Sequence, residues 1–356
     1  QDPHAPDLLF LGTEEGLYFS VDRGVNWRKW KHDVPAVPVR DMVIQAREGD
    51  LVLGTFGRAA YILEDLAPLR ALATEGPGFL RSTFRAFDAA DGYVVPNPRP
   101  AGSRFMADHV WEGANRERSA HGHLFVHPDT AKIHEEINIA IVSSTGDTLR
   151  RMTQEVDGGW QSFSWRGDMD GVRWPSRDLQ SDKDPVGGGP LVLPGTYLAV
   201  LELGSHKDSM SLTIHSDPRV PFDQESWTQA QTHTRAVQRE VSRLADLMQE
   251  VAQANEALGT MQGLWSLMPD SLTETVDSLA IEANKEISAI HDMLWTPKDF
   301  VGYDHVTVRV MDKLYGAMSS RSEAPTPNDL RKFRIAQDAI DEVETRVDSF
   351  MGGLWS

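Results

Sequence analysis

The first 64 residues consist of short segments in which apolar residues either run together or alternate with polar ones. Six segments, each about five to seven residues long, are separated mostly by Gly, Asp and Pro: "LLFLGT", "GLYFS", "NWRKW", "VRDMVI", "DLVLGT" and "AAYILED". Alternation with a period of two places the apolar side chains on one face of a strand. The pattern therefore predicts about six antiparallel β-strands between Asp7 and Glu64.

Strand-like segments continue in longer pieces from about Phe79 to His215. "INIAIVSSTGDTLRRM", "GWQSFSWRG" and "GTYLAVLELG" alternate apolar and polar residues and contain or follow the turn signals "TGD", "DGG" and "PGT". This pattern predicts a two-layer β-sandwich. Two Pro-, Gly- and charge-rich stretches, around residues 90–123 and 166–189, are longer than loops in compact domains, so we expect them to be mobile or bound to something.

From about Pro221 onward, apolar residues recur at every third or fourth position, which is the period of a helix packed on one side. Three stripes and one shorter stripe show this spacing: Val237, Val241, Leu244, Met248, Val251 and Leu258; Leu272, Val276, Leu279, Ala283, Ile287, Ile290 and Leu294; Met311, Leu314 and Met318; Phe333, Ala336, Ile340, Val343, Val347 and Phe350. The spacing predicts an antiparallel bundle of three to four helices.

Helix boundary signals agree with these stripes. Capping boxes are predicted at Ser226 with Gln229 and at Ser271 with Glu274, and Thr326 is predicted to cap a helix that begins with Pro327. We therefore expect three domains: β-strands in residues 1–72, a sandwich with two long loops in 73–218, and a helical bundle in 219–356.

The stretch "SVDRGVNW" combines residues that favour a tight turn. The side chains of Ser20 and Asp22 can bond backbone groups of their own turn, Gly24 supplies a positive φ, and Trp27 is expected to point into the layer beneath. The spacing resembles the Asp-box, or BNR repeat, of sialidase-like and sortilin-like β-propellers. In that family the Asp-box is a structural turn at the periphery, so Asp22 is expected to be structural.

The longer run from "LLFLGT" through "VPVRDMVI" to "DLVLGTFGR" resembles the last blades of bacterial sortilin-like propeller proteins, which are often labelled glycosyl hydrolases. It departs from them at Phe56, Ala59 and Ala60, where such proteins usually carry a histidine and glycines. "GPLVLPGTYLAVLELG" and "SDPRV" resemble the end of the fibronectin-type-III-like module that follows the propeller, and a helical tail comes after it. The resemblance implies export, so a periplasmic or extracellular bacterial location is expected.

About six strands make at most one and a half four-stranded blades, too few to close a ring of four to eight blades. An isolated blade leaves apolar faces and sheet edges exposed to water. We therefore expect a partial β-propeller of one to two blades, which is the remnant of a longer ancestor or is capped by the rest of the chain or by a partner protein. Because Gln1 is not an initiator methionine, we also expect that residues upstream were removed.

Composition excludes several classes of function. The formal charge of -18 repels phosphate backbones and anionic lipids, so nucleic acid is not an expected partner. No window reaches the roughly 18 apolar residues of a membrane span, so any membrane association is expected to occur through partners. The chain has no cysteine, which removes disulfides, thiolate metal sites and thiol nucleophiles.

Two stretches contain residue types that bind metal ions. His121, His123 and His127 in "HGHLFVH" have the same parity along a strand and could share a zinc or copper ion, although no fourth ligand can be located. Asp168 and Asp170 in "GDMDGVRW" resemble part of a calcium loop that lacks its first acid and its closing glutamate. We therefore expect no cofactor and interpret both stretches first as a polar strand and an ordinary turn.

Catalysis by this chain is not expected. Glycoside hydrolysis needs two carboxylates about 5 to 10 Å apart across a sugar site. The acids to which the family label points are Glu14, Glu15, Asp41 and Glu64, yet the cleft of propeller hydrolases forms where many blades converge, and most blades are missing. No G-x-S-x-G elbow or phosphate-binding loop is present.

Ten tryptophans are many for 356 residues, and five of them fall in or next to predicted loops: Trp111, Trp174, Trp265, Trp295 and Trp355. Tryptophan outside a core is a common anchor at protein interfaces, and also a platform for sugars. We therefore expect a non-catalytic accessory subunit of a larger exported or membrane-associated assembly, with a photosynthetic or respiratory complex as one candidate host. The alternatives are a glycan-active or glycan-binding propeller protein whose other blades are missing, and a periplasmic metal binder.

Overall fold

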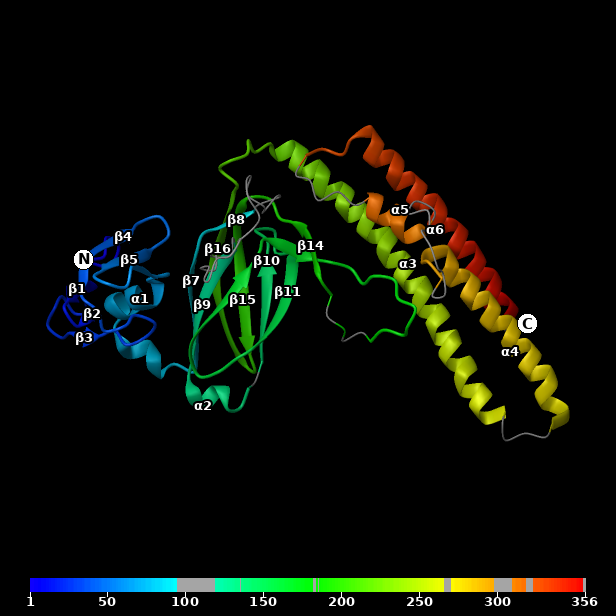
Figure 1. Cartoon of the computed structure of the whole chain (residues 1–356), viewed down its shortest axis with the longest axis horizontal. Coiled ribbons are helices and arrows are strands. Elements are labelled where there is room, and N and C mark those ends of the chain that lie inside the picture. The colour runs from blue at the N-terminus through cyan, green and yellow to red at the C-terminus, as the bar shows by residue number, and fades with distance from the viewer. Residues whose placement is uncertain are drawn as a thin grey trace. The chain divides into compact units, whose positions relative to one another are not determined.

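The computed structural model combines β-sheets in the first two thirds of the chain with long helices in the last third (Figure 1). It describes residues 1–94, 119–134, 136–181, 184, 186–265, 270–297, 309–317 and 323–354. The chain packs as two compact units: Gln1–Asp168 with Leu191–Phe222, and Met169–Pro190 with Asp223–Ser356. We call them the sheet unit and the helical unit.

The sheet unit begins with two small antiparallel sheets. Their strands follow chain order: β1 (Leu9–Thr13), β2 (Gly16–Ser20) and β3 (Arg28–Lys29), then β4 (Val39–Gln45), β5 (Asp50–Thr55) and β6 (Ala60–Leu63). Alternation along β5 turns Leu51 and Leu53 to the inner face, where they are buried against Leu8 and Leu17. Helix α1 (Ala67–Glu75) follows, and its Leu69 joins the same core.

Two larger sheets complete this unit. Their strands are β7 (Phe84–Ala90), β8 (Gly92–Val94), β9 (Ala120–Val126), β10 (Glu136–Val142), β11 (Thr148–Glu155), β12 (Gly159–Trp165), β15 (Gly195–Leu203) and β16 (His206–Ser216). One sheet has the order β11-β10-β15-β16-β8 and the other β12-β9-β7. The strands curl around a common core in the manner of a half-barrel (Figure 1). A short 3-10 helix (Pro77–Arg81) and helix α2 (Pro128–Ala131) connect the strands.

The two larger sheets face each other closely at Gly122 on β9. A Cβ added there would lie 2.4 Å from Phe163 Cε1 and 2.5 Å from Met210 Sδ. Phe163 belongs to β12 and Met210 to β16, and both are buried. Only glycine fits at this position, because side chains from both sheets already fill the space.

The helical unit contains α3 (Gln224–Trp265), α4 (Asp270–Leu294), α5 (Val310–Ala317) and α6 (Pro327–Leu354). Helix α3 begins three residues before the predicted start, because the carboxylate of Asp223, rather than Ser226, accepts backbone N–H bonds at 3.2 and 3.3 Å. The predicted cap at Thr326 is confirmed: its Oγ1 accepts from the N–H of Asp329, whose carboxylate accepts from Thr326 N. The predicted box at Ser271 and Glu274 lies outside the described side chains.

Among the described side chains, the helices pack largely through the predicted stripes, with Leu279 on α4 as an exception, and Leu272 and Met318 lie outside the described side chains. Val241, Leu244, Val343 and Val347 are fully buried at the centre. Leu279, which the period places in the core, is 62% exposed instead. The helical period shows which face of a helix a residue belongs to. It does not show whether another helix packs against that face at the position of that residue.

Residues 169–190 pack within the helical unit, although the sequence assigned them to the sandwich as a long loop. The rings of Trp174 and Tyr315 stack at 5.0 Å, and the Arg177 guanidinium lies 5.2 Å from the Trp295 ring centre. The segment that was expected to be mobile or bound is therefore bound, by helices of its own chain. At its ends, β13 (Asp168–Asp170) pairs with β14 (Gly188–Leu191).

Candidate functional site

The "SVDRGVNW" stretch forms the turn between β2 and β3. Ser20 Oγ donates to Asp22 Oδ1 at 2.7 Å and accepts from Gly24 N at 2.8 Å. The Asp22 carboxylate also accepts from the backbone and side-chain nitrogens of Asn26, and these bonds, with that from Ser20, lower the pKa of Asp22. Gly24 has a φ of +87°, as the predicted turn requires. The polar atoms of this turn bind one another.

The sequence predicted that Trp27 points into the layer beneath, and this prediction is wrong. Its side chain lies along the turn next to Gly24, and the residue is 40% exposed. Trp30 takes the inner position instead, where its ring contacts Phe19 edge-to-face at 5.8 Å.

The outer face of the sheet β4-β5-β6 carries an exposed apolar row. Val43 pairs directly with Val52, which pairs with Ile62 on the third strand. Val43 and Ile62 are 62% and 60% exposed, whereas Leu51 and Leu53 on the inner face of β5 are buried. Three β-branched residues side by side on a solvent-facing sheet are unusual for an outer face, which normally carries polar residues. We call Val43, Val52 and Ile62 the β-branched row.

An exposed aromatic ring lies in the turn that follows β5. Phe56 is 70% exposed, and the guanidinium of Arg40 lies 5.6 Å from its ring centre. Arg40 also donates to the carboxylate of Glu14 at 2.7 Å. Glu14 is one of the four acids to which the family label points, and it is therefore paired with an arginine. The others, Glu15, Asp41 and Glu64, are all exposed.

The three histidines of "HGHLFVH" have different neighbours. His121 Nε2 lies 3.1 Å from Ser119 Oγ, and His123 Nε2 lies 2.5 Å from Asp65 Oδ2. His127 lies beyond the end of β9 and caps α2, where its Nδ1 accepts from Asp129 N. Within the ranges that the structure describes, no group of three or more His, Asp or Glu side chains could hold a metal ion.

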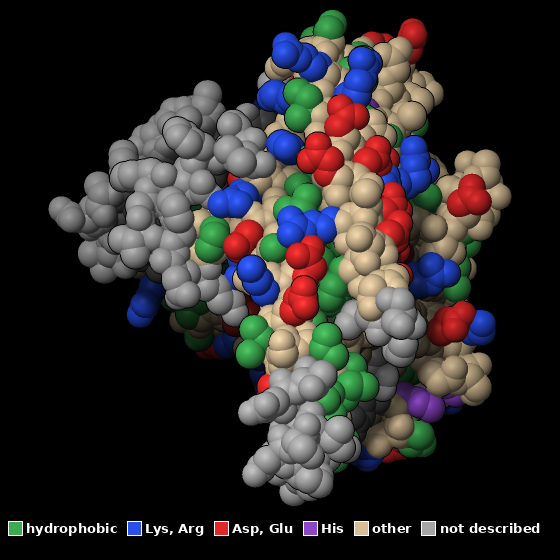
Figure 2. Space-filling model, turned by 90° about the vertical axis from the view of Figure 1, so that its right-hand side faces the viewer, with side chains coloured by type: hydrophobic (Ala, Val, Ile, Leu, Met, Phe, Trp, Pro, Cys, Tyr) green, Lys and Arg blue, Asp and Glu red, His purple; other side chains and the backbone are tan. Residues whose placement is uncertain are grey.

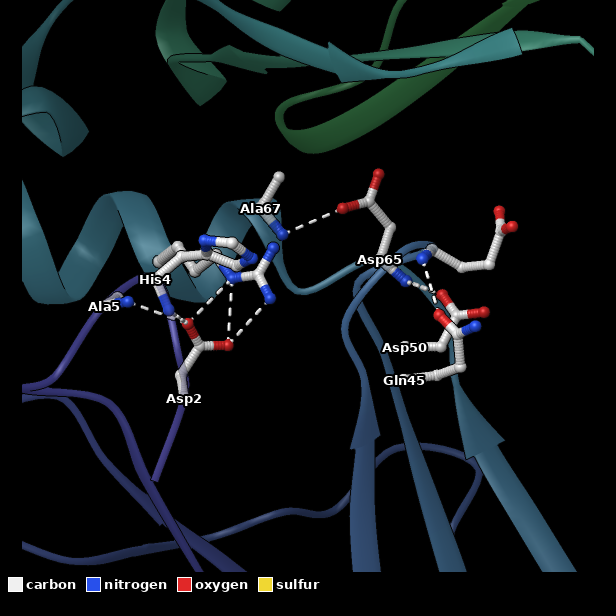
Figure 3. Close-up of polar contacts among 9 residues, drawn as sticks. Asp2, His4, Ala5, Gln45, Asp50, Asp65 and Ala67 are labelled. Atoms are coloured by element: carbon white, nitrogen blue, oxygen red, sulfur yellow. Dashed lines mark hydrogen bonds and ion pairs between the residues drawn. The ribbon is translucent and has the colours of Figure 1, made fainter. Parts of the chain in front are cut away.

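Asp65 is held in place at the junction between β6 and α1. It has a φ of +51°, its backbone N–H donates to Asp50 Oδ1 at 2.9 Å, and its Oδ1 accepts from Ala67 N at 2.9 Å (Figure 3). The bond to His123 therefore uses the remaining carboxylate oxygen. This arrangement joins the small sheets to β9 and explains the His123 contact as structural.

Asp168 and Asp170, the calcium candidates, lie on strand β13 rather than in a loop that encloses an ion. Gly171 has a packing reason to be glycine, because a Cβ there would lie 2.6 Å from the carbonyl oxygen of Gly187. The close approach of the two chain segments accounts for the glycine at position 171.

The five candidate interface tryptophans differ in their surroundings. Trp174 and Trp295 are partly buried against the core of the helical unit. Trp265 is half-buried at the end of α3, beyond the last fully buried residue of that helix, Ala252. Trp111 and Trp355 lie outside the described residues.

Two hollows of the helical unit are open and lined by charges of both signs. One, of about 420 Å³, is lined by Arg239, Arg243, Asp246, Glu250 and Glu344, together with Ser242 and Leu247. Arg243 donates to the carboxylates of Asp341 and Glu344 on α6. Figure 2 shows basic and acidic side chains side by side on this face of the molecule. Arg243 thus joins α3 to α6 at this hollow.

Comparison with protein-family models, with curated proteins and with solved structures found no match. The resemblance of the first strands to propeller blades therefore stays a prediction. In the part of the chain that the structure describes, no helix has both the length and the apolar content needed to cross a membrane.

Proposed function

We propose that this chain is a non-catalytic accessory subunit that binds other proteins of a larger exported or membrane-associated assembly. The observation that carries the proposal is the β-branched row, Val43, Val52 and Ile62, on the outer face of β4-β5-β6. Contiguous exposed apolar residues on a sheet are characteristic of surfaces that another protein covers.

The small sheets support their assignment as parts of propeller blades. Each is an antiparallel meander in chain order, and the Asp-box turn lies between β2 and β3. In a propeller, each blade packs its faces against neighbouring blades, so the outer face of β4-β5-β6 is the face that a further blade or a partner would cover. The two larger sheets, with their common core, support a fibronectin-type-III-like sandwich in the same way.

A photo-crosslinking experiment tests this proposal. A photoreactive residue is placed at position 43 or 62 of the full chain in the cells that produce it, and as a control at Ile133, which is 75% exposed on another part of the sheet unit. We expect one discrete protein adduct from positions 43 and 62 and none from position 133.

The same partner should co-purify in stoichiometric amount with the unchanged chain and not with the double variant Val43→Asn/Ile62→Asn. A chain that migrates alone and forms no adduct at either position would overturn the proposal, since the β-branched row would then be an exposed surface without a partner.

A further inference from the structure

Strand β6 forms one edge of the sheet β4-β5-β6. Among the described strands it pairs only with β5, in a register that places Ala60 opposite Gly54 and Ile62 opposite Val52. Both Ala60 and Ile62 are exposed. The far side of β6 therefore carries backbone groups to which no described strand is paired, and such an edge is a template for a strand of another chain.

A hydrogen bond in the turn before β6 shows which of its residues turn their backbone toward the edge. Thr55 N donates to Ala59 O at 3.1 Å, so these two residues form a hydrogen-bonded pair. Paired residues on antiparallel strands alternate between hydrogen-bonded and non-hydrogen-bonded positions. Ala60, one residue further, is at a non-hydrogen-bonded position, and so is Ile62. The backbone N–H and C=O groups of Ala60 and Ile62 therefore point away from β5, toward the edge.

Charges of opposite sign lie at the two ends of this edge. Arg58 is in the turn two residues before Ala60, and Glu64 follows two residues after Ile62. Both charged residues are exposed. The edge thus presents, in chain order, a base, two residues with outward backbone groups, and an acid. An antiparallel copy presents the same features in the opposite order, so the edge is complementary to itself.

We propose that two copies of this chain associate through β6, antiparallel about a two-fold axis at Tyr61. Ala60 of each copy then lies opposite Ile62 of the other, and each such pair exchanges its N–H and C=O bonds. In the same register, Arg58 of each copy lies level with Glu64 of the other. The sheet becomes continuous across both copies, through the kind of self-complementary contact that two-fold homodimers use.

Tyr61 lies on the two-fold axis. Its backbone bonds to β5, so in the dimer it faces Tyr61 of the second copy at a non-hydrogen-bonded position, where cross-strand side chains lie closest. Its ring packs against the core of the small sheets, and contact with a second ring stabilises the pairing of the strands. The inference uses the edge of the sheet, whereas the proposed function uses its outer face, and neither depends on the other.

The formal charge of -18 on each copy opposes this association. At about 0.15 M ionic strength the Debye length is about 8 Å, so salt screens the repulsion between distant charges, while pairs in contact keep most of their attraction. Dimer formation is therefore measured at this ionic strength, by sedimentation equilibrium of the full chain over a range of concentrations.

Exchange of the two charges tests the register. We expect the unchanged chain to show a monomer–dimer equilibrium. Arg58→Glu places two like-charge pairs in the dimer and should raise the dissociation constant about tenfold or more, and Glu64→Arg should do the same. The double variant Arg58→Glu/Glu64→Arg restores opposite charges in both pairs and should recover the dimer.

A mixture of the two single variants gives a second test. An Arg58→Glu chain has acids at both ends of its edge and a Glu64→Arg chain has bases at both ends, so the mixed dimer should be tighter than the dimer of either variant alone. Ile62→Pro tests the backbone bonds, because it removes an outward N–H without removing a bond to β5. Val43→Asn, on β4, is the control and should leave the dimer unchanged.

A chain that sediments as a monomer at every concentration would overturn the proposal, as would a double variant that dimerises no better than the single variants. A dimer that persists unchanged in Ile62→Pro would place the contact elsewhere and also overturn it. Each of these outcomes leaves the proposed function standing, since an adduct between position 43 and another protein does not require two copies of this chain.

Discussion

Segment 169–190 packs against the helices through Trp174 and Trp295, which the sequence predicted to be contacts with a partner protein. The variant Trp174→Ala tests this arrangement. The variant removes the ring that stacks on Tyr315 at an interplanar angle of 15°. Two further attachments remain, the Arg177 guanidinium over Trp295 and the reciprocal bonds at 3.1 and 2.8 Å between Gln180 and Gln249. The segment should therefore open more often without unfolding the bundle.

The magnitude follows from what the indole ring contacts. A stacked aromatic pair contributes about 1 kcal/mol beyond its area, and burying roughly half of an indole contributes about 1 kcal/mol more. A loss of about 2 kcal/mol in the free energy of opening raises the open population by about 30-fold, because about 1.4 kcal/mol corresponds to a factor of ten.

Limited trypsin digestion measures this population, since cleavage of a transiently open segment follows its equilibrium fraction when opening is fast. Cleavage after Arg177 should be about 30-fold faster in Trp174→Ala than in the unchanged chain. Leu179→Ala is the matched control, because Leu179 belongs to the same segment and is 46% exposed. If Arg177 is cleaved at the same rate in Trp174→Ala and in the unchanged chain, the stack does not hold the segment and the reasoning fails.

Two further predictions concern the sheet unit. Gly122→Ala should lower the free energy of unfolding by about 1 to 3 kcal/mol, because the added Cβ would overlap Phe163 and Met210. In urea unfolding, adding Met210→Ala to this variant should recover part of the loss. Purely additive effects of the two substitutions would contradict the overlap. Asp2 is buried, and although burial alone would raise its pKa, bonds from Arg70 and from the backbone of Ala5 and His4 lower it below 3.8 (Figure 3). Because the folded pKa is below the unfolded one, this stabilisation is present above pH 3.8 and is lost as the pH falls through the folded value. The urea midpoint of the unchanged chain should thus fall more between about pH 5 and about pH 2 than that of Asp2→Asn, and parallel pH profiles would refute the linkage.

Periodicity predicted the elements well where each strand or helix lies against a neighbour along its whole length. Ile137, Ile139 and Ile141 alternate along β10 and are all buried, and the stripe on α6 with Ile340 and Val343 lies in the core. Local chemistry also predicted boundaries where the capping groups are close in sequence, as at Thr326. Such features depend on neighbours a few residues away, which the sequence displays directly.

The predictions that were wrong have a common physical cause. Each depends on which segment, distant in the sequence, packs against the residue in the folded chain. Leu279 has the period of a core residue but is 62% exposed, and the period alone does not show which helix packs at that point of α4. Trp27 was predicted for the inner layer, but Trp30, whose ring contacts Phe19, takes that position instead. The histidine pattern of β9 could not reveal that Asp65 already binds His123 from 58 residues away.

The tryptophans show why a surface predicted from sequence needs the fold to become a site. Trp174 and Trp295 occur near loops, yet Tyr315 and Arg177 of the same unit occupy their faces. Trp265 has the same kind of sequence context, and it is half-buried at the end of α3, beyond the last fully buried residue of that helix. A partner can use only the apolar surface that the chain leaves uncovered. The β-branched row meets that condition, and the double variant Val43→Asn/Ile62→Asn can show whether another protein covers it.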